Sequence, residues 1–180
     1  MNLKRSTLTI NPGNFKSEIE LPYSKSYANR ALAIAAATKG EFVVKNLATS
    51  SDVVTMISCL KQLGLDIIER KNTVEVKNSF PDCEQLTSDV IKINTGDGGT
   101  TNRILLGLLS LGKNTYELCS TEKFKDRPND EAFTALGKLG VFAEKPNDSE
   151  NFWIRFKGPV KKINQLEVDC IETTQFYTGF

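Results

Sequence analysis

Histidine is absent from the 180-residue sequence, and cysteine occurs only four times. Without histidine, Ser–His and Cys–His nucleophilic sites are excluded, so any acid–base chemistry must use Lys, Asp, Glu or Tyr. The four cysteines (Cys59, Cys83, Cys119 and Cys170) are spaced 24, 36 and 51 residues apart, which matches no zinc-binding pattern. We therefore expect no metal site and no cofactor, and we interpret the cysteines as reduced thiols of a cytoplasmic protein.

The sequence also lacks a long apolar run and an excess of either charge. No apolar stretch approaches the roughly 18 residues of a membrane span, and residues 1–15 have no apolar core typical of a secretory signal. Lysine and arginine total 23 against 22 acidic residues, so bulk charge predicts no binding to nucleic acid or to a membrane. Any anion binding must therefore depend on a few placed residues.

What the sequence does contain is an internal repeat of about 74 residues. The matching segments are residues 29–32 with 102–105, 60–65 with 136–141, and 101–103 with 174–176. Three matches in the same order, at shifts of 73, 76 and 73, indicate two copies of one unit and the beginning of a third. The units are residues 16–85 (unit one), 86–158 (unit two) and 159–180 (unit three, incomplete).

Hydrophobic periodicity predicts one order of elements in each complete unit: strand, helix, strand, helix and two closing strands. Six alanines between Ala28 and Ala37 favour the first helix, which should stop at Gly40. Ser51 and Asp52 offer an N-cap to the second helix. In unit one the expected elements are residues 18–21, 26–38, 42–47, 51–63, 66–70 and 73–77.

Unit two repeats this order, and Pro128 is expected at the first position of its second helix. The expected elements are residues 90–94, 100–111, 115–119, 128–139, 141–144 and 152–156. Unit three has room only for a strand at 166–169 and one or two helical turns after Thr173. The fold class is therefore α/β, and we expect the sequence to be part of a longer chain, because an unfinished unit leaves apolar surface uncovered.

Small polar and basic residues recur at one position, the loop after the first strand and the start of the helix behind it. The three segments are residues 24–30, 96–103 and 173–175. A helix N-terminus has unpaired N–H groups and a partial positive charge, so it favours anions. Lys25 adds a cation, Gly98 and Gly99 allow close approach to the backbone, and Arg30 and Arg103 lie where a guanidinium can grip a carboxylate or phosphate. Three such sites brought together would form one large anion-binding face.

Simpler interpretations exist for each of these features. Ser and Thr at helix starts are commonly only caps, and Asp52 is most simply a cap as well. The Gly-Asp-Gly-Gly stretch can be a tight turn, and it is not a P-loop because Lys-Ser/Thr does not follow it. Arg127 is by itself an exposed cation at a helix start, where it opposes the helix dipole, and that conflict makes a functional role as good an interpretation as a solvent-exposed one.

Four motifs in order resemble those of the EPSP synthase (3-phosphoshikimate 1-carboxyvinyltransferase) family. Leu-Pro-Tyr-Ser-Lys-Ser-Tyr-Ala-Asn-Arg-Ala-Leu at 21–32 is similar to the family's Leu-Pro-Gly-Ser-Lys-Ser-x-x-Asn-Arg-Ala-Leu. Residues 96–103 resemble its Gly-Asn-x-Gly-Thr-x-x-Arg loop, Lys-Asp-Arg-Pro at 125–128 its Lys-Glu-Arg-Pro, and Thr-Thr-Gln-Phe at 173–176 its Ser-Ser-Gln-Phe. The motifs cover essentially the whole chain.

The resemblance implies a two-domain enzyme in which each domain has three such units around a pseudo-threefold axis. The family transfers the enolpyruvyl group of phosphoenolpyruvate to the 5-hydroxyl of shikimate 3-phosphate, releasing phosphate, in the shikimate pathway of aromatic amino-acid and chorismate synthesis. Its substrates bind between the domains. Residues 16–180 would supply most of one domain, residues 1–15 would belong with the other, and the second, C-terminal domain would be the missing partner.

The resemblance also implies roles for individual residues. Lys25 would contact phosphoenolpyruvate and assist proton transfer, and Asp52, Thr100, Arg103 and Lys123 are possible further members of the site. The residues implied for shikimate 3-phosphate are Lys25, Ser26, Arg30, Thr173, Thr174 and Gln175. Those implied for phosphoenolpyruvate are Lys25, Gly99, Arg127 and Gln175.

The sequence departs from the family's pattern at several positions. Tyr23 replaces Gly, Lys123 replaces Arg, and Thr173 and Thr174 replace serines. Asp97 replaces Asn, which places a negative charge beside an anion site and should weaken phosphoenolpyruvate binding. The family's catalytic Asp and Glu lie in the other domain, so we expect the chain alone to be inactive.

Three other functions compete with this interpretation. A UDP-N-acetylglucosamine enolpyruvyl transferase is disfavoured because its motif has Lys-Asn where Lys25-Ser26 stands. A non-catalytic anion-binding module remains open. An RNA-binding repeat is disfavoured by the near-neutral charge and the lack of an aromatic–basic platform.

Overall fold

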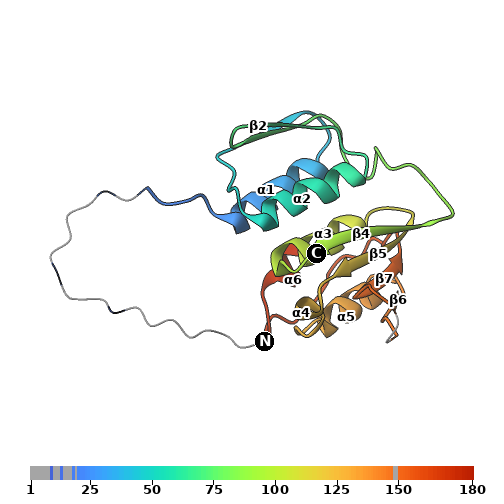
Figure 1. The fold of residues 1–180 in the computed structure, drawn as a ribbon. Helices are drawn as coiled ribbons and strands as arrows, with labels where there is room; N and C mark the ends of the chain where they lie inside the picture. The colour runs from blue at the N-terminus through green and yellow to red at the C-terminus, as the bar shows by residue number, and fades with distance from the viewer. Residues whose placement is uncertain (1–8, 10–12, 14–17, 19, 148–149) are drawn as a thin grey trace.

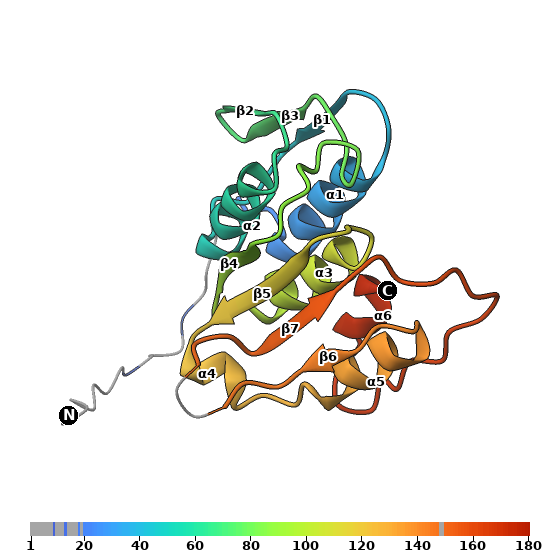
Figure 2. The same cartoon turned by 90° about the vertical axis from the view of Figure 1, so that its right-hand side faces the viewer.

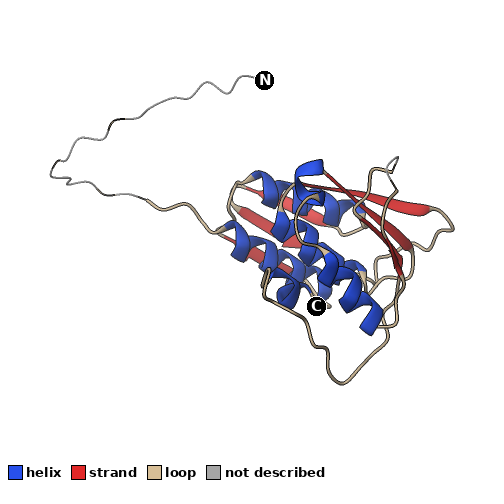
Figure 3. Ribbon diagram, turned by 90° about the horizontal axis from the view of Figure 1, so that it is seen from below, coloured by secondary structure: helices blue, strands red, loops and turns tan. Residues whose placement is uncertain are grey.

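The computed structural model of the chain describes residues 9, 13, 18, 20–147 and 150–180. It is an α/β protein in which a layer of helices lies between two β-sheets, as Figure 1 and Figure 3 show. None of the helices in these ranges combines the length and the apolar character that crossing a membrane requires.

Unit one forms the smaller sheet and the two helices that cover it. Its helices are α1 (Lys25–Ala37) and α2 (Ser51–Gln62), and its strands are β1 (Phe42–Lys45), β2 (Ile67–Arg70) and β3 (Thr73–Val76). The strand order is β1-β3-β2, with both pairs antiparallel. Ser24 caps α1 by accepting a hydrogen bond from the Tyr27 amide at 3.4 Å. Gly64, at φ +91°, follows the end of α2, and Asn72, at φ 53°, makes the β2–β3 turn.

Unit two forms the larger sheet, and the chain then returns to the helix layer (Figure 2). The strand order is β4-β5-β7-β6, with β4 and β5 parallel and the other pairs antiparallel. The strands are β4 (Val90–Gly96), β5 (Thr115–Ser120), β6 (Ala143–Glu144) and β7 (Ile154–Lys157). The helices are α3 (Gly99–Leu109), α4 (Glu122–Lys125), α5 (Asp130–Lys138) and, near the C-terminus, α6 (Gln175–Gly179).

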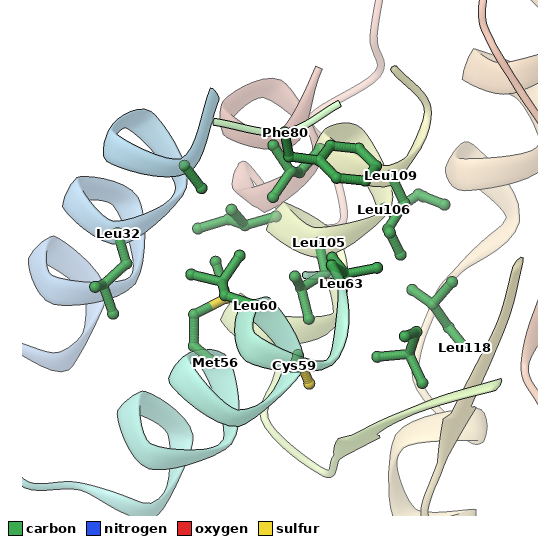
Figure 4. Packing of buried hydrophobic residues seen from close by; sticks show 14 of the residues in the cluster. Leu32, Met56, Cys59, Leu60, Leu63, Phe80, Leu105, Leu106, Leu109 and Leu118 are labelled. Atoms are coloured by element: carbon green, nitrogen blue, oxygen red, sulfur yellow. The ribbon is translucent and has the colours of Figure 1, made fainter. Parts of the chain in front are cut away.

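Helix α3 lies at the centre of the molecule, because every one of its residues is buried. It packs against α1, α2 and α6 and against strands β4 and β5. Leu105, Met56, Leu60 and Leu32 are fully buried where α1, α2 and α3 meet (Figure 4). Burying a side chain of this size stabilises the fold by roughly 1.5–3 kcal/mol, so this contact holds units one and two together.

The Glu84 carboxylate, at the end of unit one, binds several groups of unit two. Glu84 accepts hydrogen bonds from the Lys113 amide at 2.9 Å, from the Asn114 side-chain amide at 2.8 Å and from the Tyr116 hydroxyl. Burial and the neighbouring Glu84 charge raise the pKa of Tyr116, so its phenol stays protonated and remains a donor.

The expected order of elements is confirmed for unit two, with the short helix α4 in addition, and the α/β class is confirmed. The expectation that Pro128 begins a helix is wrong: α5 begins at Asp130 with Asn129 as its N-cap. Pro128 instead lies in the turn between α4 and α5, where its carbonyl oxygen accepts a hydrogen bond from Arg103 at 2.9 Å.

Two expected strands are not found among the described residues. Residues 166–169 form no strand, because side chains rather than a neighbouring strand satisfy their backbone: Lys138 donates to the Glu167 carbonyl at 2.7 Å and Glu131 accepts from the Asp169 amide at 3.0 Å. Residues 18, 20 and 21 are also not in a strand, and residue 19 lies outside the described residues. A strand requires a hydrogen-bonded neighbour, and periodicity alone does not provide one.

Candidate functional site

The glycine loop between β4 and α3 is held in place by Asn102. Its buried amide donates to the carbonyls of Gly96 at 3.1 Å and Gly98 at 3.0 Å, and its oxygen accepts from the Thr95 hydroxyl. Gly96 adopts φ +62°, which favours glycine. Gly98, the N-cap residue of α3, forms no side-chain capping bond, so within the described residues no side-chain cap takes up the first amides of the helix.

Lys25 and Asp52 form an ion pair on one side of this loop. Lys25 Nζ lies 2.8 Å from Asp52 Oδ2, and the two side chains are 54% and 11% exposed. A Cβ atom at Gly98 would be 2.8 Å from Asp52 Oδ1, so the glycine leaves the space that the carboxylate needs. The expectation that Asp52 caps α2 is wrong, because Ser50 is the N-cap residue and Asp52 lies in the first turn, where it orients Lys25.

Asn29 and Thr101 join the helix start of unit one to that of unit two. Asn29 Nδ2 donates to Thr101 Oγ1 at 3.0 Å, and the Thr101 hydroxyl donates to the Asp52 carbonyl at 3.1 Å. Both side chains are fully buried, so each bond is protected from water and expensive to leave unmade.

Arg103, Gln175 and Thr100 join the helix start of unit two to that of unit three. Arg103 Nη1 donates to Gln175 Oε1 at 2.8 Å, and Gln175 Nε2 donates to Thr100 Oγ1 at 3.2 Å. Arg103 and Gln175, which are 72 positions apart in the sequence, thus meet directly.

Arg30 links α1 of unit one to α6 of unit three. Its Nη2 donates to Thr178 Oγ1 at 3.3 Å, and its Nη1 donates to the Ser26 carbonyl at 3.2 Å. The three helix starts predicted from the repeat are therefore brought together, each linked by side chains to the next.

Arg103 and Arg127 point toward one place on this face, the backbone at Gly99. A Cβ atom there would be 2.8 Å from Arg127 Nη1, 3.0 Å from Gln175 Oε1 and 3.3 Å from Arg103 Nη1. Neither guanidinium forms an ion pair with a carboxylate in the part of the chain that the structure describes. Burial and the charge of Arg127 lower the pKa of Arg103. Two unneutralised cations beside uncapped helix amides make a site suited to an anion.

Asp97 and Lys123 are paired with each other at the edge of the loop. Lys123 Nζ lies 3.9 Å from Asp97 Oδ2, and both side chains are largely exposed. An exposed pair of this kind contributes little to stability, but it places a positive charge beside the carboxylate that replaces the family's Asn. The unfavourable effect of Asp97 on an anion is therefore partly offset.

Thr173 and Thr174 lie at the start of α6. Thr173 Oγ1 accepts from the Gln175 amide at 3.3 Å, and Thr174 is the exposed N-cap residue, without a side-chain capping bond. Both threonines directly precede Gln175, the residue that contacts Arg103 and Thr100.

Sequence reasoning missed the residues that link the helix starts to one another: Asn29, Thr101 and Thr178. A signal existed for the first, since Asn-Arg occurs at 29–30 and again at 102–103. That repetition indicates the internal repeat but not the polar contacts. Nothing in the sequence marks Thr178, because an isolated threonine after a helix start has no distinctive pattern.

The fold and this site together define an α/β protein with an anion-binding face built from repeated helix N-termini. Comparison with known proteins gives the family: the model of EPSP synthase (3-phosphoshikimate 1-carboxyvinyltransferase) matches residues 10–180, and the chain belongs to this family.

Similar proteins agree with this assignment. The 3-phosphoshikimate 1-carboxyvinyltransferase of Aliivibrio salmonicida is 32% identical over 177 residues, which cover 97% of this chain and 41% of the relative. That of Vibrio cholerae is 32% identical over 178 residues, with the same coverage. EPSP synthase from Acinetobacter baumannii has a similar fold, with a TM-score of 0.72 at 19% identity over 93% of this chain and 38% of that one. The chain thus spans about two fifths of the length of the curated relatives it matches.

Proposed function

We propose that this chain provides one wall of the active site of a shikimate-pathway transferase. The reaction moves the enolpyruvyl group of phosphoenolpyruvate to the 5-hydroxyl of shikimate 3-phosphate and releases phosphate. The observation that carries this proposal is the convergence of three helix starts with Arg103 and Arg127, neither of which is paired with a carboxylate among the described residues. Both substrates carry several negative charges, which this face can receive.

Each member of the site has a proposed role. Lys25, held by Asp52, contacts both substrates and assists proton transfer, and Gly99 and Arg127 hold phosphoenolpyruvate. Gln175 lies over the ring of shikimate 3-phosphate and also reaches phosphoenolpyruvate. The residues proposed for the remaining groups of shikimate 3-phosphate are Ser26 and Arg30 for the carboxylate side, and Thr173 and Thr174 for the phosphate.

Turnover is proposed to need a second domain. The described site supplies cations and hydroxyls, and the carboxylates beside it, Asp52 and Asp97, are each paired with a lysine. We therefore expect the 180-residue chain to bind its anionic substrates without releasing phosphate. A cytoplasmic location is supported by the four cysteines, which are all free thiols.

Titration calorimetry of the 180-residue chain with shikimate 3-phosphate and phosphoenolpyruvate tests the proposal. Lys25→Ala and Arg127→Ala should weaken binding, since each removes one cation from the face. Lys61→Ala is the matched control for Lys25→Ala, because Lys61 also forms a lysine–carboxylate ion pair, with Glu69 at 2.7 Å, but takes no part in the site.

Three results would contradict the proposal. Absence of binding by the unmodified chain would show that this face does not bind the proposed anions. Tighter binding of UDP-N-acetylglucosamine than of shikimate 3-phosphate would show that the proposed substrate is wrong. Phosphate release by the 180-residue chain at a rate typical of an enzyme would show that no second domain is needed.

A further inference from the structure

Arg103 occupies an unusual environment for a charged residue. It is only 4% exposed, and its guanidinium lies over two aromatic rings, 5.6 Å from the centre of Phe124 and 4.9 Å from that of Phe176. Its Nη2 donates to the Pro128 carbonyl at 2.9 Å and to Asn129 Oδ1 at 3.3 Å. All of its hydrogen-bond acceptors in the described part of the chain are neutral.

Burying a charge without a counter-charge destabilises the folded state, so a contribution to stability alone does not explain an arginine at this position. Arg155 shows the usual solution: it also lies over a ring, that of Phe152 at 4.5 Å, but it is paired with Glu117, Glu144 and Glu150. In addition, Arg103 Nε is buried without a hydrogen-bond partner. The fold therefore tolerates an unneutralised cation next to the proposed anion site.

The bond from Arg103 to Gln175 also decides which way round the Gln175 amide lies. A guanidinium can only donate, so the amide oxygen must face Arg103 and the NH₂ group must face away from it. The NH₂ group then donates to Thr100 Oγ1. Because this bond occupies an acceptor position of the Thr100 oxygen, the hydroxyl proton is free to point elsewhere.

We propose that Arg103 is a positioning residue of the site, which fixes the orientation of the Gln175 side chain and thereby the donors that Gln175 and Thr100 offer to the substrate. The inference rests on the proposed function, since it concerns the same site. Its first consequence, the fixed Gln175 amide, does not depend on any ligand.

Nuclear magnetic resonance of the ligand-free chain tests this consequence. The two side-chain NH protons of Gln175, assigned by their loss in Gln175→Ala, should be well dispersed and exchange slowly with solvent. In Arg103→Lys they should collapse toward the positions of exposed glutamines. Arg155→Lys is the matched control: it weakens another ring-stacked arginine and should leave the Gln175 signals unchanged. Unchanged Gln175 signals in a folded Arg103→Lys variant would overturn the proposal.

If Arg103→Lys does not fold, the contact is examined from its other end. In the unmodified chain the Arg103 guanidinium should give resolved Nη resonances, since its hydrogen bonds restrict rotation. In Gln175→Ala the Nη1 signals should broaden and shift, because their acceptor is gone. Identical Arg103 spectra in the two proteins would equally overturn the proposal.

Titration with shikimate 3-phosphate then measures what the orientation contributes. Arg103→Lys keeps a positive charge but not the fork of donors, so we expect affinity to fall about tenfold or more, the loss typical of one hydrogen bond to a charged group. Arg155→Lys should bind normally. If the unmodified chain does not bind, the proposed function fails and the resonance experiments still decide the role of Arg103. Equal affinity of the unmodified chain and Arg103→Lys would refute the positioning role.

Discussion

Replacing Gly107 by alanine should separate α6 from α3 and so disturb the site, although Gly107 is not one of the site residues. Gly107 lies in the middle of α3, where a Cβ atom would overlap the backbone carbonyl of Gly179 in α6. A Cβ atom at Gly179 would in turn overlap the Arg103 carbonyl. Backbone cannot rotate out of the way as a flexible side chain can, so the two helices have to move apart before a methyl group fits.

The size of the effect follows from two opposing terms. Alanine in place of glycine stabilises a helix interior by about 1 kcal/mol. Separation of α6 exposes part of Phe176, a buried residue worth roughly 1.5–3 kcal/mol, and weakens its contact with the Arg103 guanidinium, worth about 0.5–2 kcal/mol. We expect Gly107→Ala to lower the free energy of unfolding by about 1–3 kcal/mol and to weaken binding of shikimate 3-phosphate.

Gly137→Ala is the control, because Gly137 lies in the last turn of α5 and a Cβ atom there would meet nothing within 4 Å. That variant should gain up to about 1 kcal/mol from helix propensity alone. Urea unfolding followed by circular dichroism gives both values under identical conditions. If Gly107→Ala is as stable as Gly137→Ala, the close contact of α3 with α6 does not exist and the reasoning is refuted.

Two further predictions concern buried groups. Thr101→Val removes the acceptor of the buried Asn29 Nδ2 and one of the donors to the Asp52 carbonyl, so it should cost about 1–3 kcal/mol in urea unfolding. Thr134→Val, on an exposed helix face, should change little, and equal effects of the two variants would contradict the polar link. Burial raises the pKa of the Cys59 thiol from 9.0 to about 12, so the folded state keeps a proton that the unfolded chain releases. Stability should therefore fall as pH rises from about 9 toward 12, less steeply in Cys59→Ala, and identical pH profiles would rule this out.

The sequence predicts the parts of the fold that depend on local chemistry. Alanine content and glycine stops locate α1, and the Asn-Arg repeat places Arg30 and Arg103 at equivalent positions of two helices. The strand that the sequence wrongly predicts at residues 166–169 shows the effect of distant partners. Residues 166–169 alternate like a strand, but Lys138 and Glu131 satisfy their backbone.

The site shows the same division. Its candidate members can be proposed from the sequence because helix N-termini and cations attract anions whatever surrounds them. The pairings between these residues cannot be predicted in the same way, because the partners are far apart in the sequence: Lys25 and Asp52 are separated by 27 residues, and Arg103 and Gln175 by 72. The role of Asp52 as a partner rather than a cap could only come from the packing of α2 beside the Gly98 loop.

The third side of the site, helix α6, depends on contacts with the rest of the molecule. Helix α6 has five residues, far fewer than the roughly 12–15 that an isolated helix needs to be stable in water, so tertiary contacts must hold it. Three of those contacts lie against α3: the Gly107–Gly179 approach, the burial of Phe176 and the bond from Arg103 to Gln175. Two of the three involve Arg103, directly or through the ring beneath its guanidinium. An anion that neutralises Arg103 would therefore lower the free-energy cost of burying the residue that holds α6 in place. We expect α6 to become more ordered when such an anion binds.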